Sequence, residues 1–400
     1  MTDGSSRLAT PIGNGNSGVR ETVRAIAFHL PQFHPIPEND KWWGNGFTEW
    51  INVVRTGPLF PGHYQPHLPA DLGFYDLRLP EARAAQAQLA ADYGIYGFCY
   101  FQYWFHGRQL LERPVDEILR NSEPDFPFCL CWANESWSRR WDGGDNEILI
   151  EQRYSEADDL AHIRALLPFF LDERYVRVMG CPLFAVYRAS KLPDSRRTTD
   201  LWRQEAERAG LKGLFLVRVE SHTESGDPRE IGFDCSLEFQ QGGRLLVDRP
   251  DLRIPRRKWW HRRKLGTAEP AFYDHAIYDY EDLVRHGLNK PVLPYPRIPC
   301  VCPGWDNSAR RKTGAIILIN STPDRYEGWL REIVARRRSD MIPGSPGLIS
   351  PDSLVFINAW NEWAEANHLE PCQRWGRSYL EATRRALSVP MVEEVEYAKR

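Results

Sequence analysis

The sequence predicts an α/β fold, a single (β/α)8 TIM-type barrel with long loop insertions at its C-terminal face. Eight short apolar runs alternate with helical patterns along the 400 residues. Each run is apolar almost throughout, as is typical of parallel strands covered by helices. Aromatic and polar residues gather where these runs end, and far fewer stand where they begin. The number of runs and the chain length favour a closed barrel over an open doubly wound sheet.

The first half of the chain predicts four strands and four helices. The Ala-rich helical pattern after residue 80 stops at Gly94, and the fourth helical pattern stops at Gly210. Glycine is favoured just beyond helix ends because it adopts the left-handed conformation without a steric penalty. The expected strands are 23–30, 95–101, 128–132 and 183–187, and the expected helices are 80–93, 110–120, 156–172 and 199–209.

The second half predicts four further strands around a longer irregular stretch that ends at about residue 275. The expected strands are 214–219, 233–239, one within 291–301, and 354–359. The expected helices are a short one near Pro228, then 278–286, 326–338 and 376–387. We found no internal repeat, so one domain is expected.

Domain boundaries follow from composition. Residues 1–20 are rich in Gly, Ser and Asn and predict a disordered tail, whereas residues 21–390 predict one catalytic domain with a basic insert at about 243–275. The tail contains a GxGxxG match, Gly13–Gly18, but it precedes the first strand, and a dinucleotide fingerprint must follow a strand. We therefore expect no cofactor.

Composition limits the function classes. The formal net charge of −3 gives no electrostatic reason to expect nucleic-acid binding. Fifteen Trp, 16 Tyr and 18 Phe exceed what core packing usually requires, and many of the Trp stand beside polar residues. Such indoles suit a site that stacks on flat, weakly polar faces, which sugars offer. An oligo- or polysaccharide is the expected substrate.

The eight cysteines show no paired CxxC spacing of the kind that zinc sites use. Several lie inside apolar runs, which predicts buried, reduced thiols in a reducing compartment. No secretory signal pattern opens the chain, and no run approaches the ~18 apolar residues of a transmembrane helix. The expected location is cytoplasmic.

A basic segment, residues 253–264, stands inside the insert and contains seven Arg or Lys residues around Trp259 and Trp260. Its default interpretation is a solvated loop. The alternative is peripheral contact with an anionic surface, such as membrane headgroups or a lipid diphosphate, where each basic residue adds about 1 kcal/mol.

In a (β/α)8 barrel, the residues that follow the strands form the active site. Strand-end residues are therefore the candidates for substrate binding. They are His29, Gln32 and His34 after the first strand, Trp43, Glu49 and Trp50 in the loop beyond it, Tyr103 and Trp104 after the second, Trp132, Asn134 and Glu135 after the third, Trp305 and Asp306 after the seventh, and Trp360, Asn361 and His368 after the eighth. The alternative for Trp43, Trp50 and Trp104 is a structural role in capping the barrel mouth.

Metal binding is the alternative for two histidine pairs, His29 with His34 and His63 with His67. Pro66 forbids a helix through the second pair, and no Cys or acidic residue completes an obvious ligand set. We expect these histidines to form hydrogen bonds, and we expect no metal.

The eighth strand leads into the most concentrated chemistry in the chain, where Glu362 and Glu365 stand between Trp360 and His368. Carboxylates three residues apart on a helical turn lie about 5–6 Å apart at Cβ, near the roughly 5–5.5 Å that separates the carboxyl groups of retaining glycosidases. The alternative is two ordinary acids in the first turn of a helix. We expect Glu362 and Glu365 to be the catalytic pair.

Several motifs resemble one family, and together they cover about residues 23–388. They are HLPQFH (29–34), WWG (42–44), GFTEW (46–50), GHYQPH (62–67), WANE (132–135), RWDG (140–143), WDN (305–307) and WNEWAE (360–365). The sequence resembles the WbsX-like group, which is related to glycoside hydrolase family 99 and often labelled glycosyltransferase. The resemblance implies a (β/α)8 barrel and retaining chemistry on mannose- or rhamnose-type bacterial surface glycans such as O-antigen.

The resemblance also implies roles for the two glutamates. Glu362 would deprotonate the sugar 2-hydroxyl, which attacks its own anomeric carbon to form an anhydro-sugar. Glu365 would protonate the leaving oxygen and then activate the acceptor. Two departures stand out: Ala366 replaces an expected Gly, and Gln240 with Gln241 replaces common prolines.

Three functions compete. Hydrolysis and glycosyl transfer in O-antigen or capsule synthesis differ only in the acceptor. The chain lacks a convincing DxD motif at a strand end and a nucleotide-phosphate loop, which argues against a nucleotide-sugar donor but not against a lipid-linked one. A non-catalytic glycan-binding module is the third, and it would need the tryptophans but not both glutamates.

Overall fold

The computed structural model describes residues 22–139, 144–221, 224–240, 249–254, 270–340 and 349–388. The expected tail (1–20) and most of the basic insert lie outside these ranges. No helix within them is long and apolar enough to cross a membrane.

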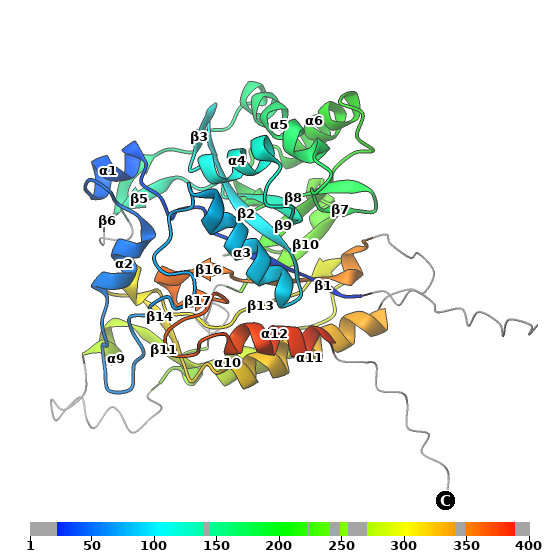
Figure 1. Ribbon diagram of the computed structural model, residues 1–400. Coiled ribbons are helices and arrows are strands. Elements are labelled where there is room, and N and C mark those ends of the chain that lie inside the picture. Colours follow the sequence, from blue (N-terminus) through cyan, green and yellow to red (C-terminus); the bar gives the residue numbers. More distant parts are fainter. Residues whose placement is uncertain are drawn as a thin grey trace, which may run out of the picture.

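Nine parallel strand segments form a nearly closed barrel (Figure 1). In chain order they are β1 (Arg24–His29), β2 (Ile95–Phe105), β4 (Phe128–Trp132), β8 (Cys181–Val186), β9 (Phe215–Glu220), β10 (Cys235–Glu238), β12 (Arg297–Ile298), β13 (Cys300–Val301) and β15 (Leu354–Ile357). β12 pairs with β10 and β13 pairs with β15. Only Pro299, which has no N–H to donate, separates β12 from β13. The two ends of the sheet therefore meet in one interrupted strand, and all eight predicted strands are confirmed.

Helices cover the outer face of the barrel. They are α3 (Pro80–Asp92), α4 (Arg113–Asn121), α5 (Glu156–Leu171), α6 (Ser195–Arg208), α10 (Tyr280–Leu288), α11 (Pro323–Asp340) and α12 (Ser378–Ser388). Figure 1 shows α10, α11 and α12 side by side along one flank. Each predicted helix is present, but the one near Pro228 is a 3-10 helix, η3 (Pro228–Ile231). Side-chain caps begin some of them: Ser155 accepts a hydrogen bond from the Asp158 N–H at the start of α5.

The barrel interior is filled by aromatic rings from different strands. The Phe28 ring lies 5.3 Å from Phe101, 5.2 Å from Phe239 and 5.4 Å from Phe356, between ring centroids. Every residue of β4, β10 and β15 is buried. The carboxyl ends of the strands are thus held on a packed, dry core.

Smaller elements follow the carboxyl ends of barrel strands. They are α1 (Pro37–Trp43) and α2 (Glu49–Arg55) after β1, β3 (Arg108–Leu110) after β2, β5 (Trp137–Arg139) and β6 (Gly144–Ile150) after β4, α9 (Ala271–Asp274) and β11 (Ala276–Asp279) after β10, β14 (Ile316–Ile319) after β13, and β16 (Asn361–Glu362) with β17 (Asn367–His368) after β15. Figure 1 shows α1, α2, β5, β6, β11 and β14 gathered on one side of the barrel. The short strand β7 (Arg177–Val178) instead pairs with the start of β8. The apolar-run pattern predicted none of these additions, because most are only two to seven residues long.

Candidate active site

A cavity of about 250 Å³ opens at the carboxyl ends of the barrel strands. Seven of its lining residues carry groups suited to sugar chemistry or stacking: Gln32, Trp43, Tyr103, Glu135, Trp305, Glu362 and Glu365. They come from the last residues of β2 and from the segments after β1, β4, β13 and β15. All seven are among the candidates that the sequence suggested, and the barrel brings them to one place.

Glu362 and Glu365 lie on a tight turn rather than on the expected α-helical turn. Glu362 ends β16 and precedes the 3-10 helix η7 (Trp363–Glu365), after which β17 pairs back antiparallel to β16. Ala366 closes the turn in the left-handed conformation, with φ of 46°. A Cβ is unfavourable there by about 1–2 kcal/mol, which accounts for the glycine expected at this position. The hairpin holds both carboxylates toward the cavity.

Arg310 joins three carboxylates at the side of this cavity. Its Nη2 lies 3.1 Å from Oε2 of Glu49 and 3.0 Å from Oε2 of Glu362, and its Nη1 lies 2.8 Å from Oε1 of Glu365. Glu49 comes from α2 and is fully buried, so it faces the cation from the side away from the cavity. One guanidinium therefore fixes the orientation of both candidate catalytic groups.

Burial and charge act in opposite directions on the two carboxyl groups. Burial raises the pKa of Glu362 to about 8, although the adjacent Arg310 opposes the rise. Burial likewise raises the pKa of Glu365 above its usual value, again against Arg310, and the negative charge of Glu49 adds to the rise in both. Glu362 and Glu365 share their one cation with Glu49, so these two carboxyl groups hold their protons to higher pH than an ordinary glutamate does.

Two tyrosines stand beside these acids. Burial raises the pKa of Tyr103 far above its usual range, and the Glu362 charge raises it further. Burial also raises the pKa of Tyr187, which senses the charges of Glu135 and Glu365. Both phenols therefore stay protonated, and both line the cavity as hydroxyl donors.

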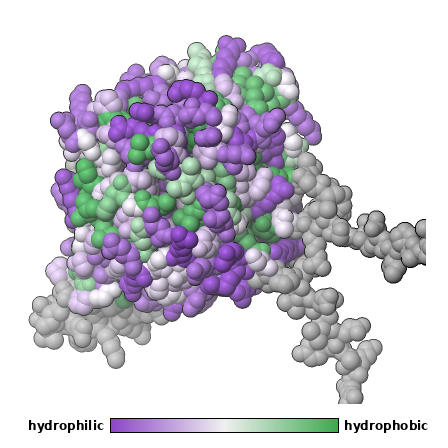
Figure 2. All heavy atoms as spheres, in the orientation of Figure 1, coloured by the Kyte–Doolittle hydropathy of each residue, from purple (hydrophilic) through white to green (hydrophobic). Residues whose placement is uncertain are grey.

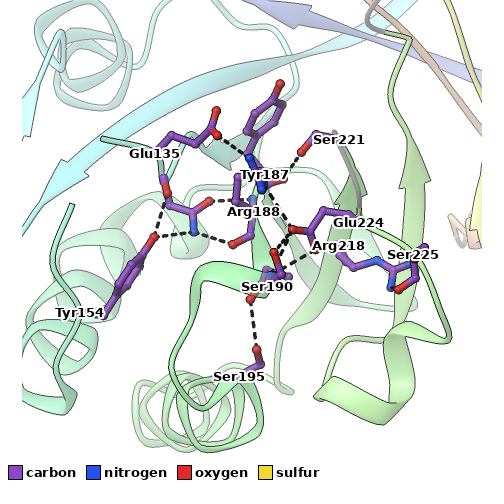
Figure 3. A network of polar contacts seen from close by, with 12 residues as sticks. Glu135, Tyr154, Tyr187, Arg188, Ser190, Ser195, Arg218, Ser221, Glu224 and Ser225 are labelled. Atoms are coloured by element: carbon purple, nitrogen blue, oxygen red, sulfur yellow. Dashed lines mark hydrogen bonds and ion pairs between the residues drawn. The ribbon is translucent and has the colours of Figure 1, made fainter. Parts of the chain in front are cut away.

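A polar network holds Glu135 in the cavity wall (Figure 3). Arg188 Nη1 lies 2.6 Å from Glu135 Oε1, while Arg188 Nε lies 3.4 Å from Glu224. Asn134 ties the segment down, because its Oδ1 accepts a hydrogen bond from the Arg188 N–H at 2.8 Å and its Nδ2 donates to the Arg188 carbonyl at 2.9 Å. Glu135 is therefore ion-paired and held in position, with 28% of its side chain exposed.

Other residues predicted to bind substrate lie behind the cavity wall. His29 and His34 are buried, and burial lowers the pKa of His29 to about 3 and of His34 to about 4, so both are neutral. The indoles of Trp50, Trp104 and Trp132 donate to Tyr75 O, Asp158 Oδ1 and Trp104 O respectively. Trp360 and Asn361 are fully buried. None of these seven residues lines the cavity, so their contacts support it from behind.

Asp306 and His368 face a second, neighbouring cavity, and Trp305 lines both. Asp306 accepts hydrogen bonds from His63 Nε2 at 2.6 Å and Gln65 Nε2 at 2.8 Å. His63 thus forms a hydrogen bond with Asp306, as the sequence predicted for this histidine. Within the described ranges, no cluster of three or more His, Cys, Asp or Glu residues is arranged to hold a metal ion.

Sequence reasoning missed Arg310 and Tyr187. Arg310 belongs to a run of three basic residues, Arg310–Lys312, that is indistinguishable in sequence from a solvated loop. The WDN motif only five residues before it was the available signal. The role of Arg310 depends on long-range contacts with α2 and η7, and a local sequence pattern does not contain such contacts.

Comparison with known proteins shows what this chain is similar to. A family model described as "Glycosyltransferase WbsX" matches residues 25–383. Two curated proteins named WxcX, from strain B100 and a second strain of Xanthomonas campestris pv. campestris, are 44% identical over 370 residues, which cover 92% of this chain. The chain spans about half the length of these relatives, since the match covers 50% of each.

Solved structures share the fold at low sequence identity. A protein described as "Glycoside hydrolase-like protein" has a TM-score of 0.55 and 13% identity, and the match covers 96% of this chain and 98% of that one. The GH99 endo-alpha-mannosidase from Bacteroides thetaiotaomicron has a TM-score of 0.51 and 14% identity, with 91% and 96% covered. The fold is thus one that glycoside hydrolases use, and the chain belongs to the WbsX glycosyltransferase family of carbohydrate-active enzymes.

Proposed function

We propose that this chain breaks and forms glycosidic bonds with retention of configuration, acting on a mannose- or rhamnose-type bacterial surface glycan. The observation that carries the proposal is the pair of glutamates, Glu362 and Glu365, both held by Arg310 in a cavity lined with aromatic rings. The family supports chemistry on glycans. The type of sugar comes from the resemblance to family 99.

In the first step, Glu362 removes the proton of the sugar 2-hydroxyl. The resulting 2-oxygen forms a bond to its own anomeric carbon while the bond from that carbon to the leaving oxygen breaks. Glu365 gives its proton to the leaving oxygen, so the products of this step are a 1,2-anhydro-sugar and a free hydroxyl.

In the second step, Glu365 takes the proton of an acceptor hydroxyl as that oxygen bonds to the anomeric carbon. The bond between the anomeric carbon and the 2-oxygen breaks, and the 2-oxygen recovers a proton from Glu362. Water as acceptor gives hydrolysis, and a sugar hydroxyl gives transfer. Both carboxyl groups return to their starting protonation states.

The electrostatics of the site suit these roles. A general base works best when its pKa lies near the working pH, and the pKa of about 8 makes Glu362 a stronger base than an ordinary carboxylate. The raised pKa of Glu365 keeps a proton available for the leaving group. Tyr103 and Tyr187 add hydroxyl donors to the cavity wall.

Glycosyl transfer in O-antigen or capsule synthesis is the second candidate, and the family description favours it. The sequence has no nucleotide-phosphate loop, which argues against a nucleotide-sugar donor, so a lipid-linked donor is the one we propose for transfer. All eight cysteines are free thiols, which supports a cytoplasmic location, where such glycans begin to be assembled. A binding module without catalysis has no use for two glutamates on one arginine.

Glu365→Gln tests the proposal most directly. We expect it to lower turnover by about 10²–10⁴-fold, the usual contribution of a general acid–base group, while glycan affinity stays within a few-fold. Glu362→Gln should behave in the same way, and Glu332→Gln on the exposed face of α11 is the matched control.

The assay incubates mannose- and rhamnose-containing glycans with and without an acceptor sugar and follows the products by mass spectrometry. A glycan fragment joined to the acceptor sugar indicates transfer. A fragment with a free reducing end indicates hydrolysis. Full activity of Glu365→Gln on a glycan that the native chain converts would refute its role.

A further inference from the structure

A second cavity of about 500 Å³ adjoins the one that holds Glu362 and Glu365. Trp305 lines both cavities, and Ala366 and His368, from the turn that carries Glu365, line the second one. The Asp306 N–H donates to the Glu365 carbonyl at 2.7 Å, so the wall between the cavities is tied together through its backbone. The volume lies within the range of about 300–1,000 Å³ that ligand pockets occupy.

The lining of the second cavity has the chemistry of a saccharide site. The rings of Tyr64, Trp305 and Trp375 offer flat faces, and Asn320 and Thr322 add amide and hydroxyl groups. Trp305 is 6% exposed and its buried indole N–H has no hydrogen-bond partner among the described residues. A buried donor without a partner is costly unless a ligand or water satisfies it.

Arg374 distinguishes this cavity from a neutral sugar site. Its guanidinium carbon lies 4.6 Å from the Tyr64 ring centroid and 5.1 Å from the Trp375 ring centroid. Within the described parts of the chain, no carboxylate lies within ion-pair distance of it. Arg325, on the same cavity, does have such a partner, because its Nη1 lies 3.2 Å from Asp279. Arg374 is thus a cation held between two rings with its charge unmatched.

The other ionisable groups in the cavity are matched or neutral. Asp306 accepts hydrogen bonds from His63 and Gln65, so its carboxylate already has partners. His67 and His368 contact each other at 2.9 Å, and burial lowers the pKa of both, to about 4 for His67. Arg374, an exposed residue, is therefore the lining arginine for which the described residues supply no carboxylate, and its charge is available to an anion.

We propose that this second cavity binds a saccharide unit that carries an anionic group, a carboxylate or a phosphate, with the sugar ring against the aromatic wall and the anion paired with Arg374. Arginine suits this role because its planar fork matches the oxygens of both groups. The site lies next to the proposed catalytic pair and would hold the part of a glycan beyond the reacting bond. Binding there does not require the proposed reaction, and so it is measured without turnover.

The test is isothermal titration of the full chain with four probes: cellobiose, cellobiouronic acid, glucose 1-phosphate and inorganic phosphate. We expect at least one of the two anionic sugars to bind about tenfold more tightly than cellobiose, the size of one charge-assisted hydrogen bond. The advantage should shrink as salt is raised from 20 to about 300 mM, because exposed charges are screened. If cellobiouronic acid binds more tightly, the site recognises a carboxylate. If glucose 1-phosphate binds more tightly, the site recognises a phosphate.

Arg374→Gln should remove that tenfold preference and leave cellobiose binding unchanged. Arg377→Gln is the matched control: this nearby exposed arginine pairs with Asp71 and does not line the cavity, so the variant should keep the preference. Trp375→Leu should weaken every sugar probe. Glu365→Gln should leave all four affinities unchanged, which separates this proposal from the proposed reaction.

Three results would overturn the proposal. Equal affinity for cellobiose and both anionic sugars would show that no anion is recognised. An equal loss in Arg374→Gln and Arg377→Gln would indicate a general charge effect. Inorganic phosphate that binds as tightly as glucose 1-phosphate would indicate a bare anion site without a role for the sugar.

Discussion

At the residue scale, the cluster of Arg310 with Glu49, Glu362 and Glu365 governs the site. A buried cation among three carboxylates leaves an excess of negative charge, and the molecule relieves it by holding protons. Glu362 and Glu365 therefore titrate as a coupled pair, with apparent pKa values that belong to the pair. This gives Glu49, which does not line the cavity, an influence on the chemistry inside it.

A pH profile tests this influence. The acidic limb of kcat/KM should lie near pH 8, because the proposed base, Glu362, has a pKa of about 8 and activity rises as this carboxyl group loses its proton. The charge of Glu49 raises the pKa of both Glu362 and Glu365. Removing that charge in Glu49→Gln should lower both pKa values and move the acidic limb to lower pH. Glu151→Gln, at an exposed ion pair with Arg153, should leave the limb in place. If the limb of the pH profile does not move in Glu49→Gln, Glu49 has no electrostatic influence on Glu362 and Glu365.

At the element scale, the end of the first strand and the start of the catalytic hairpin are joined by one side chain. Asn361 Oδ1 accepts from the Leu30 N–H at 2.7 Å, and its Nδ2 donates to the Leu30 carbonyl at 3.0 Å. Nδ2 also lies 3.2 Å from the Tyr75 hydroxyl. Asn361 thus acts as a clamp between β1 and β16 rather than as a lining residue of the cavity.

Loss of this clamp should lower the stability of the fold. Asn361→Ala leaves the buried N–H and C=O of Leu30 without partners, and we expect the free energy of unfolding to fall by about 2–4 kcal/mol. Urea denaturation followed by circular dichroism measures it. Asn121→Ala, at the exposed end of α4, should change it by less than about 0.5 kcal/mol. Equal effects of the two substitutions would argue against the clamp.

At the scale of the whole molecule, two cavities meet at Trp305 at the carboxyl ends of the barrel strands. The visible surface in Figure 2 mixes small apolar patches with polar residues. The basic insert leaves the barrel after β10, which is the same end of the barrel.

Contact between the insert and an anionic surface remains a prediction. Only Arg253 and Ile254 of the segment 253–264 lie within the described residues, and Arg253 donates to the His275 carbonyl. Replacing the six basic residues beyond them (Arg256, Arg257, Lys258, Arg262, Arg263 and Lys264) with Gln should weaken sedimentation with phosphatidylserine vesicles. The expected loss is about tenfold or more, since each base near such a surface adds about 1 kcal/mol. Neutral phosphatidylcholine vesicles are the control, and unchanged sedimentation would make the insert an ordinary loop.

The sequence by itself determined the order of strands and helices, because buried parallel strands are continuous apolar runs and such runs are visible in any single chain. It also placed Gln32, Trp43, Tyr103, Glu135, Trp305, Glu362 and Glu365 at strand ends, where a barrel brings them together. Only the tertiary structure decided which strand-end residues face the cavity and which, like Trp132 and Asn361, pack behind it. Local pattern cannot separate these two groups, since the direction of a side chain after a strand depends on what it meets across the fold. Arg310 shows the same limit most clearly: its role as the shared cation comes from carboxylates 261, 52 and 55 residues away in the chain.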